Sequence, residues 1–133
     1  MTSVRVASNN SRYGQDVTIR QFQLTADEPP TLGGDDTGPA PFEWILVGLG
    51  SCKAITLKMY AERKGWNLER VTVDLTYESH EGDPFITAHL TLEGDLNDEQ
   101  RQRLREISDR CPAHKLLTTP VPIQTQLVDL AGT

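Results

Sequence analysis

The sequence is poor in cysteine and lacks a long hydrophobic run, and both shortages exclude classes of protein. Two cysteines among 133 residues are too few for the disulfide scaffold of a small secreted domain. The most apolar stretch stops at Lys53, short of the roughly 20 residues that a membrane-spanning helix needs. The N-terminus contains no apolar signal-peptide core. We therefore expect a cytoplasmic protein without a membrane span.

Positive charge is also scarce, and the motifs of several large enzyme classes are missing. The formal net charge of −6 does not favour nucleic acid or an anionic membrane as a partner. No phosphate-binding loop, dinucleotide fingerprint or serine-hydrolase motif occurs, so we expect no cofactor. A chain of this length is expected to form one domain, residues 1–133, that buries about two-thirds of its unfolded surface.

One segment, residues 33–66, predicts a long central helix. It reads GGDDTGPAPFEWILVGLGSCKAITLKMYAERKGW. Pro41 suits the first turn of a helix, and Gly65 suits the position just past its end. A helix over residues 41–64 would be about 35 Å long and would cross the whole molecule.

The predicted helix is apolar on nearly all sides of its first half. One stripe steps by four and three residues through Ile45, Leu49, Cys52, Thr56 and Met59. Lys53 and the charged residues after it predict a solvated side. Gly48 and Gly50 predict the close approach of another backbone, because each weakens a helix by roughly 1 kcal/mol. A chain this small cannot cover such a helix alone, so we expect an obligate homodimer.

The remaining elements are mostly strands, which places the chain in the α+β class. Alternating apolar residues predict strands over residues 4–6, 17–26 (as one or two strands), 71–77, 85–92 and 123–128. A capping box of Asn97 and Gln100 starts a second helix, which ends before Pro112. Residues 112–118 are a candidate for a short helix. This order predicts an antiparallel sheet that covers a buried helix.

The two cysteines lie on the apolar sides of the two predicted helices, so both point toward the core and could meet. A buried free cysteine is often only a small hydrophobe. Burial also raises a thiol pKa, whereas a nucleophile needs the thiolate. A reactive Cys52 therefore requires a cation from another element, and Arg12 and Arg20 near the N-terminal strands are the candidates. Either arginine could instead be an ordinary exposed residue.

Glu43 precedes Cys52 by nine residues, which places it half a turn away and about 13.5 Å along the same helix. It can reach a Cys52 thiol only if a second copy of the helix packs antiparallel to the first. The alternative is that Glu43 simply complements the dipole at the helix N-terminus.

Cys111 and His114 are also spaced as zinc ligands could be, and Cys52 could join them. The other histidines are His80, which lies in a predicted turn, and His89. The set lacks a convincing fourth ligand, so we predict no metal site.

Five motifs carry a resemblance to a known family. They are Gly33-Gly34-Asp35 with Gly38-Pro39, Pro41-Phe-Glu43, Leu49-Gly-Ser-Cys52, Met59-Tyr-Ala to Arg63-Lys-Gly-Trp66, and Arg110-Cys111-Pro112. The chain resembles, over nearly its whole length, the OsmC/Ohr family of osmotically induced and organic hydroperoxide resistance proteins, and its details are closer to the OsmC-like branch.

The resemblance implies an intertwined homodimer, with sheets wrapped around two central helices, that acts as a thiol peroxidase on organic hydroperoxides. Cys52 would be the peroxidatic thiolate, and Cys111 would convert its sulfenic acid to a disulfide that an external dithiol reduces. The family arginine comes from the N-terminal region, where Ser11-Arg12-Tyr13-Gly14 is similar. The family glutamate falls at Phe42, one residue before Glu43.

Two functions thus compete. One is an enzyme of oxidative or osmotic stress defence, whose pocket around Cys52 is walled by Leu49, Met59 and the partner chain's Phe42 or Trp44. The other is a non-enzymatic dimer that binds an apolar small molecule or lipid in such a pocket.

Overall fold

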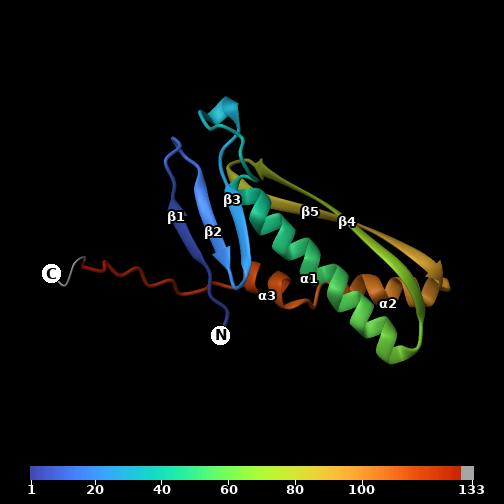
Figure 1. The fold of residues 1–133 in the computed structure, drawn as a ribbon. Helices are drawn as coiled ribbons and strands as arrows, with labels where there is room; N and C mark the ends of the chain where they lie inside the picture. The colour runs from blue at the N-terminus through green and yellow to red at the C-terminus, as the bar shows by residue number, and fades with distance from the viewer. Residues whose placement is uncertain (130–133) are drawn as a thin grey trace.

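The computed structural model describes residues 1–129 and is an α+β fold, as predicted (Figure 1). Its elements, in chain order, are β1 (Arg5–Ser8), β2 (Gln15–Ile19), β3 (Phe22–Ala26), the 3-10 turn η1 (Pro30–Leu32), α1 (Pro41–Lys64), β4 (Asn67–His80), β5 (Asp83–Asp95), α2 (Asp98–Ser108) and α3 (Pro112–Leu117). The second helix and the short helix after it are therefore confirmed.

The long helix α1 begins and ends at the predicted residues. The Glu43 carboxylate accepts a hydrogen bond from the Ala40 N–H at 2.8 Å, which satisfies one unpaired donor of the first turn. Gly65 has φ +70° and ends the helix in the left-handed conformation that glycine tolerates best.

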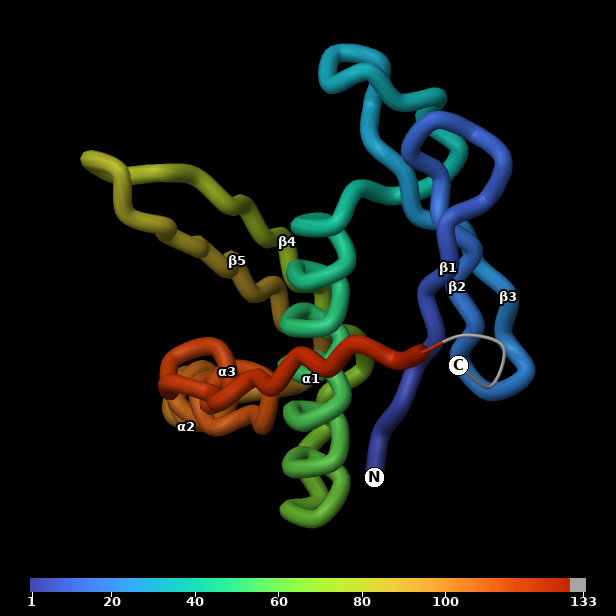
Figure 2. The backbone as a smooth tube through the Cα atoms, turned by 90° about the vertical axis from the view of Figure 1, so that its left-hand side faces the viewer, coloured from blue at the N-terminus to red at the C-terminus, as the bar shows by residue number. Residues whose placement is uncertain are grey.

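Two antiparallel sheets lie on different sides of α1. Strands β1, β2 and β3 form a meander, and β4 and β5 form a long hairpin with a bulge between Leu68 and Arg70. Figure 2 shows the meander on one side of the helix and the hairpin on the other. The core lies between α1, α2 and the start of β4, and its buried members are Leu57, Ala61, Leu68, Leu104 and Ile107.

The predicted buried stripe of α1 is wrong after Leu49, because the buried residues lie about one position further along the chain than predicted. The helix buries Leu49, Gly50, Lys53, Leu57 and Ala61, whereas Met59 of the predicted stripe is 60% exposed. The first half of α1 is apolar on almost every side, so the sequence pattern carried little information on the direction of the core.

Packing against β4 decides which side of α1 is buried. A Cβ atom at Gly50 would lie 2.7 Å from Cδ1 of Leu75, so this glycine makes room for a β4 side chain rather than for another backbone. Gly48 has no neighbour within 4 Å of such an atom. Within the described residues of one chain, therefore, no other backbone packs closely against these two glycines, contrary to the prediction.

The predicted last strand, over residues 123–128, is wrong for the single chain. The segment from Pro120 to Asp129 has no strand assignment, and its apolar side chains, such as Leu127, are exposed. A strand needs a partner for its backbone N–H and C=O groups, and among the described residues no strand pairs with this segment. The remainder of the predicted C-terminus, residues 130–133, lies outside the described residues.

The structure also bears on membrane association. Among residues 1–129, no helix combines the length and the apolar character needed to span a bilayer.

Candidate functional site

The two cysteines come together at the junction of α1 with α3. Both are free thiols, and Cys111 is fully buried while Cys52 is partly exposed. Cys52 is close enough to Cys111 to raise the pKa of the Cys111 thiol. The backbone N–H of Ala113 also donates to Cys52 Sγ at 3.5 Å, which links the turn of one cysteine to the thiol of the other.

The local sequence explains how Cys111 is held. It is the N-cap residue of α3, and the His114 N–H donates to its Sγ at 3.3 Å. Pro112 follows at the first helical position, where a missing N–H costs nothing. This turn fixes the Cys111 sulfur beside α1.

The surroundings of Cys111 oppose its ionisation. Burial raises the pKa of the Cys111 thiol above its ordinary value, and the neighbouring Cys52 thiol raises it further. The His114 N–H and the positive charge of Lys53 act in the opposite direction on that pKa. The balance keeps Cys111 a thiol near neutral pH.

Lys53 is the residue of this region that the sequence analysis placed wrongly. Its side chain is 3% exposed, although a solvated position was predicted. Its Nζ donates to the Ser108 carbonyl at 2.9 Å and lies 3.0 Å from His114 Nδ1 and 3.4 Å from Asp109 Oδ1. Its spacing of four residues from both Leu49 and Leu57 was the signal that could have placed it on the buried side.

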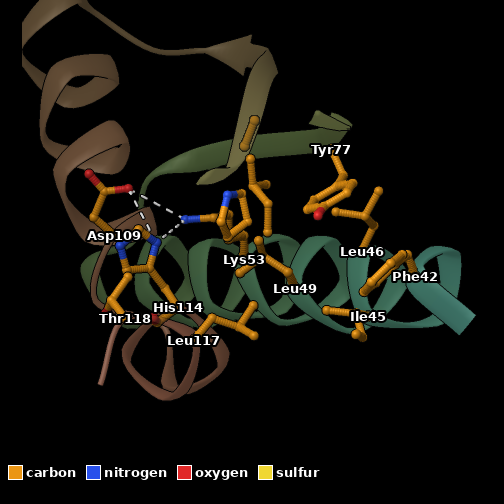
Figure 3. A pocket seen from close by; sticks show the side chains of 13 residues that line it. Phe42, Ile45, Leu46, Leu49, Lys53, Tyr77, Asp109, His114, Leu117 and Thr118 are labelled. Atoms are coloured by element: carbon orange, nitrogen blue, oxygen red, sulfur yellow. Dashed lines mark hydrogen bonds and ion pairs between the residues drawn. The ribbon is translucent and has the colours of Figure 1, made fainter. Parts of the chain in front are cut away.

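These contacts use the full donor capacity of the lysine. An ammonium group has three donors and no acceptor, and the Ser108 carbonyl, Asp109 Oδ1 and His114 Nδ1 supply one neighbour for each of them. Figure 3 shows the lysine, the histidine and Asp109 converging on one point.

A cavity of about 520 Å³ extends from this polar cluster along α1. Its other walls are mostly apolar and come from α1, the β4–β5 hairpin and α3, as Figure 3 shows for Phe42, Ile45, Leu46, Leu49, Tyr77 and Leu117. The Phe42 and Tyr77 rings stack at 4.9 Å and close one end.

The cavity only partly matches the predicted one. Leu49 and Phe42 line it, but Phe42 comes from the same chain rather than from a partner, and Met59 and Trp44 are not among its lining residues. Neither cysteine lines it. The apolar cavity and the thiol pair are therefore neighbours rather than one site.

The other predicted site residues lie elsewhere in the single chain. The Arg12 guanidinium lies over the Tyr13 ring at 4.9 Å, and the Arg20 guanidinium over the Phe22 ring at 5.1 Å. Glu43 caps α1. Within residues 1–129 of one chain, no recorded hydrogen bond or ion pair joins any of the three to Cys52, so their roles at the thiol stay predictions.

The histidines are dispersed as well. His80 stacks on Phe85 at 4.4 Å, and His89 faces Asp74 across the hairpin. In the described part of the chain, no group of three or more His, Cys, Asp or Glu side chains is placed to hold a metal ion. The contacts of His114 are instead with Lys53.

Comparison with known proteins gives one family and several similar structures. A model of the family described as OsmC-like protein matches residues 33–126. The OsmC-like protein from Mycoplasma pneumoniae is 21% identical, with a TM-score of 0.75 over 88% of this chain and 86% of that chain. No curated protein matches significantly.

Two further similar structures carry functional names. One is an organic hydroperoxide resistance protein OsmC from Legionella pneumophila, 17% identical, with a TM-score of 0.69 over 89% of both chains. The other is the organic hydroperoxide resistance protein OhrB of Bacillus subtilis, 18% identical, with a TM-score of 0.62 over 89% of this chain and 90% of that one. At these identities the likeness establishes the fold.

Proposed function

The chain belongs to the OsmC-like family, and we propose that it is a thiol-dependent peroxidase that reduces organic hydroperoxides in defence against oxidative or osmotic stress. The observation that carries this proposal is the placement of a partly exposed thiol, Cys52, beside a buried one, Cys111. Two proteins of similar fold are named for organic hydroperoxide resistance, which supports it.

In the first step the Cys52 thiolate attacks the terminal oxygen of the hydroperoxide. The S–O bond forms as the O–O bond breaks, the sulfur loses two electrons, and the alkoxide takes up a proton and leaves as the alcohol. Partial exposure of Cys52 gives the peroxide access to the sulfur.

In the second step Cys111 resolves the resulting sulfenic acid. Its thiolate attacks the Cys52 sulfur, the S–S bond forms, the S–O bond breaks, and hydroxide takes up a proton to leave as water. An external dithiol then reduces the disulfide by thiol exchange and becomes a disulfide itself. A reducing cytoplasm supplies such dithiols, and we propose that location.

We further propose that the working form is a homodimer. An exposed stripe on α1, formed by Gly48, Ile55 and Met59, runs beside Cys52. Antiparallel packing of two such helices would bring the partner's Glu43 toward Cys52. The same assembly would allow Arg12 or Arg20 of a partner to approach the thiol, where a cation lowers its pKa.

A second candidate function is the non-enzymatic binding of an apolar molecule. The cavity favours it, because its walls are mostly apolar and neither cysteine lines it. In that case Cys52 would react with peroxides no faster than an ordinary exposed thiol.

The test compares kcat/KM for hydrogen peroxide with that for tert-butyl and cumene hydroperoxides, using several dithiols as reductants. If the alkyl group of the substrate enters the neighbouring apolar cavity while the peroxide reaches Cys52, burial of about four methylene or methyl groups contributes roughly 3 kcal/mol, which corresponds to about a hundredfold preference for the organic substrates when the gain persists in the transition state. Equal values, or a preference for hydrogen peroxide, would defeat the apolar-pocket model. Absence of turnover with every peroxide and dithiol would favour the binding function.

A further inference from the structure

The burial of Lys53 requires an explanation that core packing does not supply. A buried ammonium group costs free energy unless its donors are all satisfied, and a lysine is almost never fully buried without partners. Here all three donors have partners, and each partner lies outside α1. The lysine therefore joins α1 to another part of the chain.

The partners of Lys53 lie on both sides of one cysteine. Ser108 and Asp109 precede Cys111, and His114 follows it. Lys53 itself directly follows Cys52 in α1. The three contacts thus fasten both ends of the Cys111 turn to the helix residue next to the other thiol.

We propose that Lys53 is a positioning residue of the resolving step: it holds the turn of residues 108–114 so that the Cys111 sulfur faces Cys52, and it places a buried positive charge near that sulfur. The role of Lys53 in a resolving step rests on the proposed peroxidase function. The contacts of Lys53 with the turn around Cys111 do not depend on that function. The step it serves is the attack of the Cys111 thiolate on the Cys52 sulfenic acid, with hydroxide leaving as water.

The charges around Cys111 come from three elements. Helix α1 contributes Lys53 and the Cys52 thiol, the end of α2 contributes Asp109, and α3 contributes His114, whose Nδ1 lies 3.0 Å from Lys53 Nζ and 3.9 Å from Asp109 Oδ1. The Lys53 side chain is 3% exposed and that of Asp109 50%. Water screens the carboxylate more than the ammonium, so the pair acts on the buried sulfur as a net positive charge.

The experiment titrates the Cys111 thiolate by its ultraviolet absorbance in a Cys52→Ser background, where it is the remaining cysteine. Lys53→Met removes the charge at similar length and should raise the Cys111 pKa by about one unit, a tenfold loss of thiolate at neutral pH. Asp109→Asn removes the countercharge while keeping the shape, and should lower that pKa. Lys53→Arg restores the charge and should bring the pKa back toward the parent value.

Opposite shifts in the two neutral variants are the signature of a charge effect, because a purely structural role would not reverse sign. Unchanged pKa values, or shifts in the same direction, would overturn the inference. Asp109 is half exposed, so Asp109→Asn is expected to fold even where Lys53→Met does not, and a raised Cys111 pKa in it would contradict the inference by itself.

A kinetic experiment uses protein in which both cysteines are present. After one equivalent of tert-butyl hydroperoxide, conversion of the sulfenic acid to the disulfide should be at least about threefold slower in Lys53→Met, because the tenfold loss of thiolate is partly offset by a nucleophilicity that rises with the thiol pKa. An unchanged conversion rate would also overturn the proposal. If the parent protein does not react with peroxide at all, the peroxidase function fails, whereas the titration still decides the role of Lys53.

Discussion

Cys111 is a fully buried thiol, and in the proposed mechanism it must lose a proton to attack Cys52. Burial raises its pKa, mainly by disfavouring the thiolate, so the folded protein holds this proton to a higher pH than the unfolded chain does. In the proposed mechanism Cys111 stays protonated until the resolving step, in which it ionises and attacks Cys52. Its titration should also be visible in the stability of the fold.

The stability prediction follows from the raised Cys111 pKa. Because the folded state binds the proton more tightly, this group's contribution is complete below the unfolded pKa of about 8.5 and is lost as the pH rises through the folded value. The free energy of unfolding in urea should therefore fall more between pH 7.5 and about 9.5 in the parent than in Cys111→Ala. Equal declines in the two proteins would contradict a raised Cys111 pKa.

At the scale of single residues, the sequence indicated that the two cysteines could meet but placed Lys53 on a solvated side. Apolar spacing alone put both cysteines on core-facing sides of predicted helices, although Cys111 follows α2, which ends at Ser108, and is the N-cap residue of α3. Lys53 has the same kind of spacing, but a lysine is normally taken as exposed, and its three partners come from a turn more than fifty residues away. No local pattern encodes such contacts.

At the scale of elements, local signals determine where α1 begins and ends, whereas packing determines which of its sides is buried. Pro41 and Gly65 set its ends, because their backbone preferences are local. The choice of buried side depended on Leu75 of β4, which fits against Gly50. The strand predicted at 123–128 failed for a related reason, since strand formation depends on a neighbour that the single chain does not offer there.

The two glycines of α1 give a matched pair of variants. Gly50→Leu would place a bulky side chain against Leu75 and should destabilise the fold by about 1–3 kcal/mol through overpacking. Gly48→Leu meets nothing within 4 Å of its Cβ in the chain and should not lower intrachain stability, since leucine is the better helix former. Urea unfolding at several protein concentrations measures both, because a loss that acts through the dimer depends on concentration and a loss that acts within the chain does not. Equal, concentration-independent destabilisation by both variants would contradict the position of α1 on the hairpin.

At the scale of the whole molecule, much apolar surface has no cover in one chain. Beyond the exposed stripe of α1, the meander and the extended C-terminal segment present Val4, Val6, Phe22, Ile123 and Leu127. Large exposed apolar side chains in such number favour an interface with another molecule. A second copy of the chain is the simplest occupant, because residues from far-apart segments would be covered at once.

Sedimentation at micromolar concentration should therefore give a dimer, and Gly48→Leu should weaken it, because the larger side chain would hold the two α1 helices apart. A matched control is Gly82→Ala, a change in the exposed turn of the β4–β5 hairpin, which should leave the mass unchanged. A compact folded monomer for the parent protein would contradict the dimer, and with it the proposed approach of Glu43 and the arginines to Cys52.

In the proposed reaction one peroxide is reduced while the Cys52 and Cys111 thiols are oxidised to a disulfide. The most direct test is intact-protein mass spectrometry after one equivalent of tert-butyl hydroperoxide, without external reductant. We predict that each chain releases one alcohol and loses two hydrogen atoms, and that a dithiol reverses this loss. Cys111→Ser should stop at the sulfenic acid, one oxygen heavier, and Cys52→Ser should not react. An unaltered parent protein, or a Cys52→Ser variant that consumes peroxide at the parent rate, would contradict it.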